Sequence, residues 1–498
     1  MNVFDFLADA ARSSPRAIAW RGASPGAGAD YASAHGAALQ LARRLVERGV
    51  LPGDRVACLM HNCVEHWLAY YAVAAAGAIF VSLNTRLATV ELQAIVAHSG
   101  ACLVLHDGPH TGAAAALGPA PLAVFHRELG GEPLEPELAD GHSPAQLYYT
   151  SGTTGRPKGV VLTHDNVVTH ARTAADELSL RGTDRWAHIA PMFHLADAWA
   201  AFAITHVCGE HSFLPQFSAI AALDLLEHER TTITNLVPTM LNLMVADASA
   251  EHRGYGLRLM LSGGAPIAPE VVRRVLQVFR CDYVQTYGMT ETSPYLTLGI
   301  LPPELAALPA EERLRMQCKT GRPFRGVELR VVDDAGHPVP ADGSSVGEIR
   351  VRGATVTPGY WQDPQATAAA FDAEGFLCTG DLATIDAHGF VDIVDRKKDV
   401  IKTGGENVYS VEVEHVLYTH PAVLECAVIG APHPVWGEMV TAAVVLRPGA
   451  VTGAEELIAH VRDRLAHFKA PKKVFFLDAL PRTGSGKITK RALRDQLG

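Results

Sequence analysis

The sequence predicts an α/β protein: a large N-terminal domain of two doubly wound sheets and a small β-rich subdomain, followed by a separate α+β C-terminal domain. Its 498 residues are roughly three times the usual domain size of about 150, so a single core is not expected. Short apolar runs alternate with helical runs over most of the chain, which is typical of parallel sheets. With 48% hydrophobic and 19% charged residues, the composition is that of a folded globular enzyme.

The first sheet is expected between residues 32 and 106. Three helical runs close at Gly49, Gly77 and near Gly100, and each is followed by a short apolar run. A helix that ends in glycine and leads into a buried strand is the pattern of a βαβ unit. The strands are expected at residues 55–60, 79–83 and 101–106. Residues 107–144 are dense in Gly, Pro and Ala, which predicts a surface connection.

The second sheet is expected between residues 184 and 292, where strand-like runs at 231–237 and 257–261 alternate with helical runs. Residues 327–393 follow a different pattern, because strands such as ELRVVD and GEIRVRG alternate in polarity between Gly, Asp and Pro turns. This pattern predicts a small antiparallel sheet or barrel.

A further change of pattern after Asp395 predicts two domains, at residues 1–395 and 396–498. In the second domain, Thr452 and Glu455 have the spacing of a capping box at the start of a helix. That helix is expected to run from about residue 453 to 468, with an apolar stripe of Leu457, Val461, Leu465 and Phe468. The remaining elements are expected as a helix at 411–419 and strands at 424–429 and 440–446.

Composition also excludes several classes of protein. The formal net charge of −10 opposes attraction to phosphate backbones, so no nucleic-acid partner is expected. The eight cysteines form no CxxC pair, which fits a cytoplasmic protein in a reducing compartment. Asp5 falls where a signal peptide needs a basic and then an apolar region, so no export signal is expected. The apolar run at 67–85 is interrupted by Gly77, which predicts a buried helix and strand rather than an integral membrane span.

The most informative segment is YYTSGTTGRPKGVVLTH at residues 148–164. A strand runs into small or hydroxylated residues and then a lysine, and exposed N–H groups, hydroxyls and positive charge together suit a polyphosphate. These residues are Thr150, Ser151, Gly152, Thr153, Thr154, Gly155 and Lys158. The segment does not fit GxxxxGK[ST], and neither does GSGKI near the C-terminus, so a P-loop NTPase is disfavoured.

This segment and four later ones resemble, in order, the motifs of the adenylate-forming superfamily. That superfamily contains acyl- and aryl-CoA synthetases, peptide-synthetase adenylation domains and firefly-type luciferases. The four later segments are YGMTET (287–292), TGD (379–381), DRKKDVIKTGGENVYSVEVE (395–414) and PRTGSGKI (481–488). SGGAP (262–266), which precedes them, is similar to the stretch that lines the adenine and acyl site in this superfamily. The resemblance covers residues 30 to 494, and it implies the adenylate-forming enzyme fold with a mobile C-terminal domain.

The resemblance implies a role for individual residues. Besides the phosphate loop, the residues expected to bind ATP or AMP are Gly263, Gly264, Ala265, Tyr287, Gly288, Met289, Asp381 and Arg396. The residues expected in catalysis are Lys487, Thr290 and Glu291, of which Glu291 would bind Mg²⁺. The acyl pocket is expected at His194, Gly263 and Gly288, the hinge at Lys398, and the loop facing coenzyme A (CoA) at Lys402, Gly404 and Gly405. Taken alone, Asp381 would be read as a turn aspartate and Lys487 as a solvated lysine in a basic tail.

These roles fit the chemistry of acid activation. A carboxylate is a poor electrophile, so it attacks the α-phosphorus of ATP and becomes a mixed anhydride while diphosphate leaves. Mg²⁺ and the loop donors would offset charge repulsion, and Lys487 would bridge the carboxylate and the phosphate. Thiol attack on the acyl carbonyl then requires rotation of the C-terminal domain about Lys398.

The nature of the acid and of the acceptor is less constrained. At 190–197, APMFHLAD has His194 after Phe193, where amino-acid-activating relatives have aspartate, which argues against an α-amino acid. Asp197 is expected to face a polar substrate group. CoA is the expected acceptor, and a carrier protein loaded by an acyl-AMP ligase is the alternative. A non-enzymatic nucleotide-binding protein would be expected to lack Lys487, Glu291 or Asp381, and all three are present. The resemblance is also compatible with a homodimer.

Overall fold

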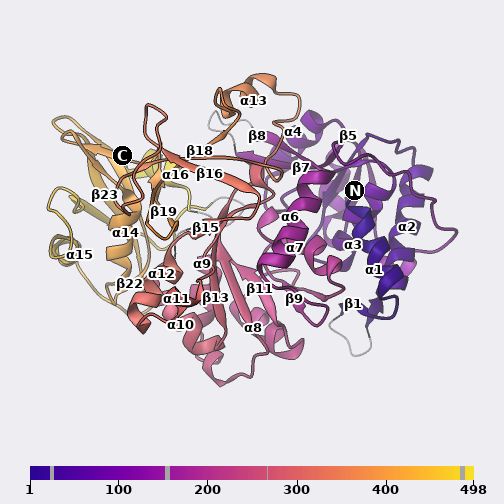
Figure 1. Ribbon diagram of the computed structural model, residues 1–498, viewed down its shortest axis with the longest axis horizontal. Coiled ribbons are helices and arrows are strands. Elements are labelled where there is room, and N and C mark those ends of the chain that lie inside the picture. Colours follow the sequence, from indigo (N-terminus) through magenta and orange to yellow (C-terminus); the bar gives the residue numbers. More distant parts are fainter. Residues whose placement is uncertain (23–26, 152–156, 266, 483–487, 498) are drawn as a thin grey trace.

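The computed structural model describes residues 1–22, 27–151, 157–265, 267–482 and 488–497. Figure 1 shows the chain passing from the indigo N-terminal helices at one end of the molecule to the yellow C-terminal sheet at the other. The predicted fold class is confirmed, because two sheets with a parallel centre, a small antiparallel sheet and an α+β C-terminal region follow one another along the chain.

A six-stranded sheet forms the N-terminal part of the molecule. Its strands are parallel except for the last, which forms an antiparallel hairpin with its neighbour. In spatial order they are β6 (Ala120–Ala123), β5 (Ala101–His106), β3 (Arg55–Leu59), β4 (Ile79–Ser82), β7 (Pro144–Ser151) and β8 (Pro157–Thr163). The three predicted strands are confirmed. The surface connection expected at 107–144 is only partly right, because it contains the edge strand β6.

The second sheet has nine strands, and its centre is parallel. In spatial order they are β15 (Arg322–Pro323), β14 (Tyr295–Leu298), β13 (Asp282–Gly288), β12 (Leu259–Gly263), β11 (Ile233–Leu236), β9 (Arg185–His188), β10 (Glu210–Phe213), β1 (Ile18–Arg21) and β2 (Gly28–Asp30). The N-terminal strand β1 joins this sheet rather than the first, through parallel pairing of Trp20 with His211.

A layer of helices packs between these two sheets. Residues from both sheets and from the helices form one continuous core, in which Phe80, Trp199 and Leu261 are fully buried. The helices of this layer are α1 (Phe4–Ser13), α3 (Val64–Ala75), α6 (His164–Glu177) and α7 (Leu195–His206). Most positions of α3 and α7 are apolar and buried on every face, as expected for helices covered on all sides. The predicted helix at 67–76 and strand after it are confirmed.

The other helices of the large domain are α2 (Tyr31–Glu47), α4 (Thr89–Ser99), α5 (Thr111–Ala115), α8 (Ala219–His228), α9 (Pro238–Ala246), α10 (Pro269–Phe279), α11 (Pro303–Ala306), α12 (Ala310–Cys318) and α13 (Pro364–Ala370). Of these, α4 and α5 cover the outer face of the six-stranded sheet, and α8, α9, α10 and α12 cover that of the nine-stranded sheet. Helix α2 packs beside α1 and α3 (Figure 1). Local sequence fixes several of their ends. The Asp30 side chain accepts a hydrogen bond from Ser33 at the start of α2, and Gly100 closes α4 in the left-handed conformation.

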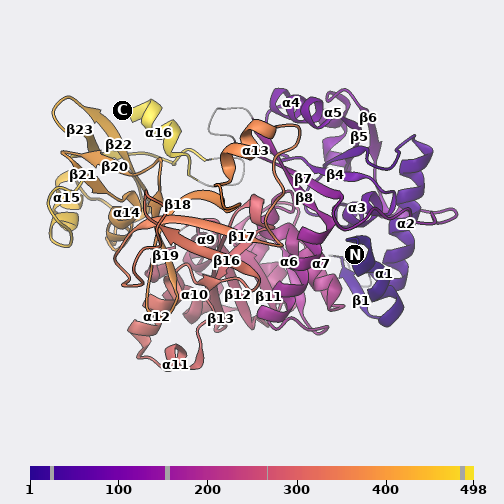
Figure 2. The same ribbon diagram turned by 45° about the horizontal axis from the view of Figure 1, so that its top comes forward.

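The small antiparallel sheet lies between the large domain and the C-terminal region in both views (Figures 1 and 2). Its strands are β16 (Val327–Val332), β17 (Gly347–Gly353), β18 (Leu377–Ile385) and β19 (Val391–Arg396), in that order. The C-terminal region contains the sheet β21 (Glu406–Val408), β20 (Ile401–Thr403), β23 (Gly437–Leu446) and β22 (Val423–His433), with β24 (Lys473–Phe476) on β23. Its helices are α14 (Ser410–Tyr418), α15 (Ala454–Arg462) and α16 (Lys490–Leu497).

The prediction for helix α15 is partly wrong. The helix ends at Arg462, about a turn and a half before the expected end, because the chain turns back toward strand β24. Lys469 fixes this turn through an ion pair of 2.7 Å with Glu412 on α14. The expected capping box is also wrong, since Thr452 donates to the carboxylate of Glu456 and Gly453 is the N-cap.

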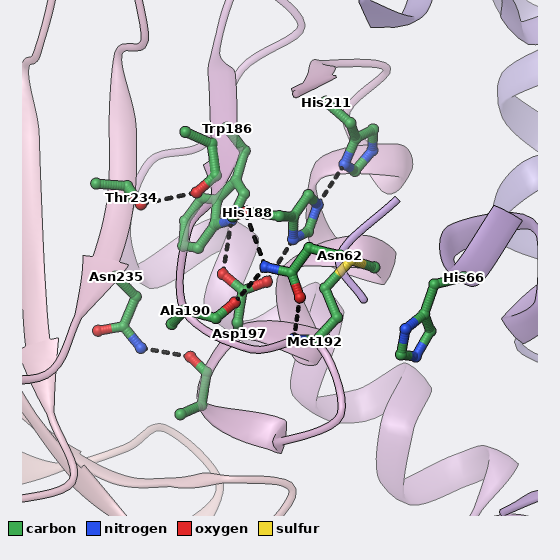
Figure 3. A network of polar contacts seen from close by, with 12 residues as sticks. Asn62, His66, Trp186, His188, Ala190, Met192, Asp197, His211, Thr234 and Asn235 are labelled. Atoms are coloured by element: carbon green, nitrogen blue, oxygen red, sulfur yellow. Dashed lines mark hydrogen bonds and ion pairs between the residues drawn. The ribbon is translucent and has the colours of Figure 1, made fainter. Parts of the chain in front are cut away.

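Asp197 does not face the substrate as expected, because its carboxylate belongs to a buried polar network behind residues 190–194 (Figure 3). Its two oxygens contact Trp186 Nε1 at 3.2 Å and His188 Nδ1 at 2.5 Å. The other nitrogen of His188 lies 3.0 Å from His211, which contacts Thr205 in turn. The carboxylate therefore holds the end of β9 against α7.

Asn62 connects the two sheets through the same region. Its side-chain nitrogen donates to the carbonyl oxygens of His188 and Ala190, and its oxygen accepts from the backbone N–H of Met192 (Figure 3). Asn62 follows strand β3 of the first sheet, whereas its partners are the last residue of β9 and two residues of the irregular segment after it. One side chain thus satisfies three buried backbone groups at the end of β9 and beyond it.

The structure describes no helix with the length and hydropathy needed to cross a membrane. All eight cysteines are present as free thiols.

Replacing Asp197 by alanine is expected to lower the free energy of unfolding by roughly 3 kcal/mol, because His188 and Trp186 would keep buried donors without an acceptor. Urea unfolding would show this loss as a lower midpoint concentration. Tryptophan fluorescence reports on this region directly. Asp197→Asn keeps one acceptor oxygen, so the free energy of unfolding is expected to fall by about half as much. The exposed control Asp463→Ala should stay within about 0.5 kcal/mol of the parent; a loss for Asp197→Ala as small as that of the control would contradict a stabilising role.

Candidate active site

The residues expected to bind adenine and the acyl group gather at one edge of the nine-stranded sheet. Strands β12 and β13 are parallel neighbours that end at Gly263 and Gly288, so the segments that follow them lie side by side. These segments carry Gly264 and Ala265 after β12, and Met289, Thr290 and Glu291 after β13. Ligands of open α/β sheets typically bind in the crevice at this edge.

Gly288 and Gly263 are required by the packing of the backbone. A Cβ atom on Gly288 would lie 1.7 Å from the carbonyl oxygen of Pro294, and one on Gly263 would lie 2.2 Å from Oγ1 of Thr286. Neither position can accept a side chain without displacing a neighbouring strand. The backbone packing is by itself sufficient to explain why glycine occupies both positions. Their role in the acyl pocket stays a prediction.

Three predicted nucleotide-binding residues meet around the carboxylate of Asp381. Tyr287, at the end of β13, donates its hydroxyl to Asp381 Oδ2 at 2.6 Å. Arg396 is the register partner of Asp381 across β18 and β19, and its Nε lies 3.4 Å from Oδ1. Burial, and then the negative charge of Asp381, raise the pKa of Tyr287, so its hydroxyl keeps its proton and remains a donor. Tyr287 lies 94 residues before Asp381, so the end of β13 and the β18–β19 hairpin meet at this carboxylate.

A second group forms around Glu291, which is almost fully buried. Tyr360 donates its hydroxyl to Glu291 Oε1 at 3.0 Å, and Lys158 Nζ lies 4.9 Å from the centre of the Tyr360 ring. The backbone holds this arrangement, because Thr357 N–H donates to the carbonyl oxygen of Glu291 and Trp361 N–H donates to that of Gly159. Tyr360 therefore joins the lysine of the phosphate loop to the predicted magnesium ligand.

The phosphate loop connects the two strands of the β7–β8 hairpin. Thr150 and Lys158 are register partners in it, as are Ser151 and Pro157. The residues of the loop that lie outside the described part of the chain are Gly152, Thr153, Thr154 and Gly155.

His194 and Phe193 lie between the end of β9 and helix α7, for which His194 is the N-cap residue. Their rings make an edge contact, with centres 4.6 Å apart. On the other side of Phe193, the guanidinium of Arg86 lies 5.9 Å from the ring centre. Arg86 and Phe193 line a cavity of about 350 Å³, and burial lowers the pKa of Arg86. The segment predicted to wall the acyl pocket thus borders an open cavity.

On the N-terminal side of the predicted hinge the chain contacts the small antiparallel sheet, and on its C-terminal side it contacts the C-terminal region. Lys397 N–H donates to the carbonyl oxygen of Gly380, and its ammonium lies 3.2 Å from Glu348, both in the small antiparallel sheet. Asp399, two residues later, pairs instead with Arg494 of helix α16 at 2.7 Å. Lys398 lies between them and is exposed.

The predicted CoA-facing loop is the turn between β20 and β21. Gly404 and Gly405 have φ values of +61° and +90°, and a Cβ atom on Gly405 would meet open space. Hydrogen bonds join the N–H of Lys402 to Glu438 and the N–H of Gly404 to the carbonyl oxygen of Trp436. Both partners belong to the C-terminal region, so this loop is attached to the part that is expected to move.

Lys487 lies outside the described residues, but the helix that follows it is firmly attached. Lys490, the first residue of α16, lies 2.7 Å from Glu414 and also contacts Oγ of Ser410. Ser410 in turn donates from N and Oγ to Asp395. Although burial lowers it, the carboxylates of Glu414 and Asp395 raise the pKa of Lys490 overall. The ammonium thus joins α14 and α16 to the end of β19.

No role was predicted from the sequence for three residues near the site: Tyr360, Asn62 and Lys490. For Asn62 a signal was available, because it is a polar residue directly after an apolar strand of a predicted parallel sheet. Tyr360 follows a Pro-Gly turn in a stretch without periodicity, so only its aromatic character beside a turn could have indicated a role. The role of Lys490 depends on partners 76 and more residues away, and no local pattern reveals them.

Comparison with known proteins gives consistent results. Residues 7–361 match the family model of the AMP-binding enzyme, and residues 412–487 match that of the AMP-binding enzyme C-terminal domain. The chain is 39% identical over 493 residues to a feruloyl-CoA synthase from Amycolatopsis sp, covering 98% of this chain and 97% of that protein.

Two solved structures show the same architecture over the whole chain. ATP-bound MatB from Rhodopseudomonas palustris is 32% identical, with a TM-score of 0.89 over 100% of this chain and 99% of that one. The o-succinylbenzoate-CoA synthetase MenE from Bacillus subtilis, in complex with its acyl-adenylate intermediate, is 32% identical, with a TM-score of 0.86 over 99% and 97%. The resemblance inferred from the motifs is confirmed, and this chain belongs to the AMP-binding enzyme family.

Proposed function

We propose that the chain is an ATP-dependent acyl-CoA ligase, which activates a carboxylic acid as an acyl-adenylate and transfers the acyl group to CoA. The convergence of Tyr287, Asp381 and Arg396 carries this proposal. A buried carboxylate beside an arginine suits a ribose, whose two hydroxyls donate hydrogen bonds, next to a phosphate. The names of the feruloyl-CoA synthase and the o-succinylbenzoate-CoA synthetase support CoA as the acceptor rather than a carrier protein.

In the first step, a carboxylate oxygen of the acid attacks the α-phosphorus of ATP. The bond from that phosphorus to the bridging oxygen of diphosphate breaks, and the acyl-adenylate forms. Both reactants are anions, so the site must supply positive charge and hydrogen-bond donors. Lys158, the backbone around Thr150 and, from the C-terminal domain, Lys487 are the groups proposed to supply them.

Glu291 fits a magnesium site. Mg²⁺ prefers oxygen ligands and usually keeps several waters beside one or two carboxylates and the phosphates of a substrate. The Tyr360 hydroxyl donates to one oxygen of Glu291, which orients the carboxylate. When bound there, Mg²⁺ would offset the negative charge of the phosphates, while Thr290 would donate to a phosphate oxygen.

In the second step, the CoA thiol loses its proton and attacks the acyl carbonyl. A C–S bond forms, the bond to the AMP oxygen breaks, and AMP leaves. We propose that residues 396–498 rotate about Lys398 between the two steps and bring Lys402, Gly404 and Gly405 to the acyl group. The change of partners between Lys397 and Asp399 supports a pivot at this point. The domain boundary at 395 stays a proposal, and β19 extends one residue beyond it.

The acid is proposed to be apolar, either aryl or alkyl, beyond its carboxylate. Asp197 is engaged inside the protein and offers no charge to a substrate, which removes the reason to expect a polar acid. The residues proposed around the acid are the aromatic His194 and Phe193 and the side-chain-free Gly263 and Gly288. The feruloyl-CoA synthase relative supports an aryl acid. A homodimer and a cytoplasmic location stay predictions.

The proposed function is tested with a panel of aryl, alkyl and amino acids, assayed for diphosphate release and for thioester formation with and without CoA. An aryl or alkyl acid should release diphosphate, and CoA should convert the adenylate to a thioester. Lys487→Ala should lower diphosphate release by on the order of 10² to 10³. Lys473→Ala, on the same domain and exposed, is the matched control. Thioester formation on a carrier protein but not on CoA would overturn CoA as the acceptor.

The Tyr360–Glu291 contact is expected to matter for adenylation. Tyr360→Phe keeps the ring beside Lys158 and removes one hydrogen bond to a carboxylate, so diphosphate release should fall about tenfold. The apparent KM for Mg²⁺ should rise at the same time. Tyr255→Phe is the control, because its hydroxyl bonds to the carbonyl oxygen of Ala250, away from the site. If both variants keep full activity and an unchanged KM for Mg²⁺, Tyr360 does not orient the magnesium ligand.

The hinge is expected to affect only the second step. Lys398→Pro restricts the backbone at the proposed pivot, so thioester formation should slow at least about tenfold while diphosphate release stays within about threefold. Rapid-quench measurement of acyl-AMP and thioester separates the two steps. Lys398→Ala keeps the backbone free and should behave like the parent. Equal loss of both steps in Lys398→Pro would exclude rotation about this residue.

A further inference from the structure

Two histidines and an aspartate come together on the first sheet, apart from the nucleotide-binding edge of the second. Strands β3 and β5 are parallel neighbours, and Leu59 at the end of one pairs with His106 at the end of the other. The loops that follow therefore leave the sheet side by side. They bring His61 from the first loop to Asp107 and His110 from the second. The proposed ligase reaction assigns no role to these three side chains.

The three side chains present ligand atoms to a common point. Nδ1 of His61 lies 3.2 Å from Oδ2 of Asp107, and Nδ1 of His110 contacts Oδ1 of the same carboxylate. The two imidazole rings are 4.4 Å apart between centres. One ligand atom from each residue can be chosen so that all three lie within 4.8 Å of one another. The side chains are 13 to 19% exposed, so the cluster is mostly covered but open to solvent.

This spacing suits a transition-metal ion. Bonds of about 2.0–2.1 Å from Zn²⁺ to nitrogen and oxygen place neighbouring ligands of a tetrahedral site roughly 3.3 Å apart. The separation between His61 and Asp107 is already close to this value. The ligand atom of His110 lies within 4.8 Å of the other two, so its side chain would have to shift when the ion binds. Imidazole nitrogens with one carboxylate are ligands that zinc prefers, whereas Mg²⁺ and Ca²⁺ prefer oxygen alone.

Neighbouring groups hold the ligands in place. The backbone N–H of His61 donates to Asp107 Oδ2 at 3.0 Å, and that of His110 donates to the carbonyl oxygen of Asp107. The side-chain amide of Gln216 lies 3.2 Å from Nε2 of His61. The amide atom that faces the ring is Nε2 of Gln216, a donor. Exchange of its nitrogen and oxygen by an amide flip lets Gln216 accept a hydrogen bond from Nε2–H of His61, which leaves Nδ1 as the metal ligand.

We propose that His61, Asp107 and His110 bind a divalent ion of the zinc class, with a fourth position open to the adjoining cavity. The cavity of about 350 Å³ is lined by His61 and Gln216 and extends to Arg86 and Phe193, which leaves space for a water ligand. Three protein ligands with an open fourth position distinguish such a site from a closed structural one. The ion cross-links the loops that follow β3 and β5.

The test uses the whole chain, treated with a chelator and then dialysed free of metal, without ATP or magnesium. Zn²⁺ is titrated in competition with a chromogenic chelator, and Co²⁺ is titrated by visible absorption. One equivalent should bind with micromolar or tighter affinity, Co²⁺ should give the bands of a four-coordinate site, and Zn²⁺ should raise the melting temperature.

Variants assign the binding to this cluster. His110→Ala should weaken binding at least about 100-fold and abolish the thermal shift, and Gln216→Ala should weaken binding about tenfold. His142→Ala is the control, because its side chain is 95% exposed and lies elsewhere on the surface. His110→Gln replaces His110→Ala if the alanine variant does not fold, as judged by circular dichroism.

Two outcomes overturn the proposal. Absence of a stoichiometric site at micromolar Zn²⁺ would mean that the three side chains form only hydrogen bonds. Undiminished binding in the His110 variant that folds would place the ion elsewhere on the chain. Neither outcome affects the ligase proposal, because that reaction is assayed separately with magnesium.

Discussion

The backbone of Gly288 lies so close to the carbonyl oxygen of Pro294 that no side chain fits between them, and the rest of the site depends on this contact. The absence of a side chain lets β13 approach β14 at this point, and Gly263 allows a similarly close approach of β12 to β13. The segment from Tyr287 to Glu291 is thereby held on a rigid backbone. Asp381 and Tyr360, which come from later parts of the chain, reach a surface whose position is already determined.

Where the backbone is irregular, buried polar side chains fix the position of the segments around the site. Asn62 holds residues 188–192 from the first sheet, and Asp197 holds them from helix α7. At the hinge, Asp395 and Ser410 join β19 to α14 across the proposed boundary. These contacts are hydrogen bonds in buried surroundings, where a missing partner costs more than a good contact contributes. Each of these contacts therefore selects one packing of its segment and contributes less to the overall stability of the fold.

Much of the fold could be predicted from local patterns. Helices ending at Gly49, Gly77 and Gly100 and the apolar strands after them follow from backbone conformation and burial, which the sequence displays directly. The motif residues Tyr287, Asp381 and Arg396 could be named because each lies in a recognisable segment, and the structure brings them together. In the first two sheets the predicted strand ends agree within one or two residues, whereas β22 ends four residues later and β23 begins three residues earlier than expected.

The predictions that were wrong concern residues whose position depends on tertiary contacts, which a local sequence pattern does not show. Asp197 was expected to face the substrate, but its partners Trp186 and His188 lie on the preceding strand and are identified only by packing. Strand β6 is an edge strand in a stretch rich in Gly, Ala and Pro, so its pairing depends on the neighbour rather than on its own residues. Phe468 was expected on the apolar stripe of α15, but it lies in the turn beyond the end of the helix and is 39% exposed.

The position of Tyr360 affects how the site receives its ligands. A lysine and a glutamate in a partly dry pocket attract one another strongly, and a collapsed pair would have to be separated before each could meet a phosphate or a cation. The tyrosine contacts both charges, with its ring face toward Lys158 and its hydroxyl toward Glu291. Both contacts are weaker than an ion pair. Freeing Lys158 and Glu291 from Tyr360 is therefore expected to cost less than separating a direct ion pair between them would.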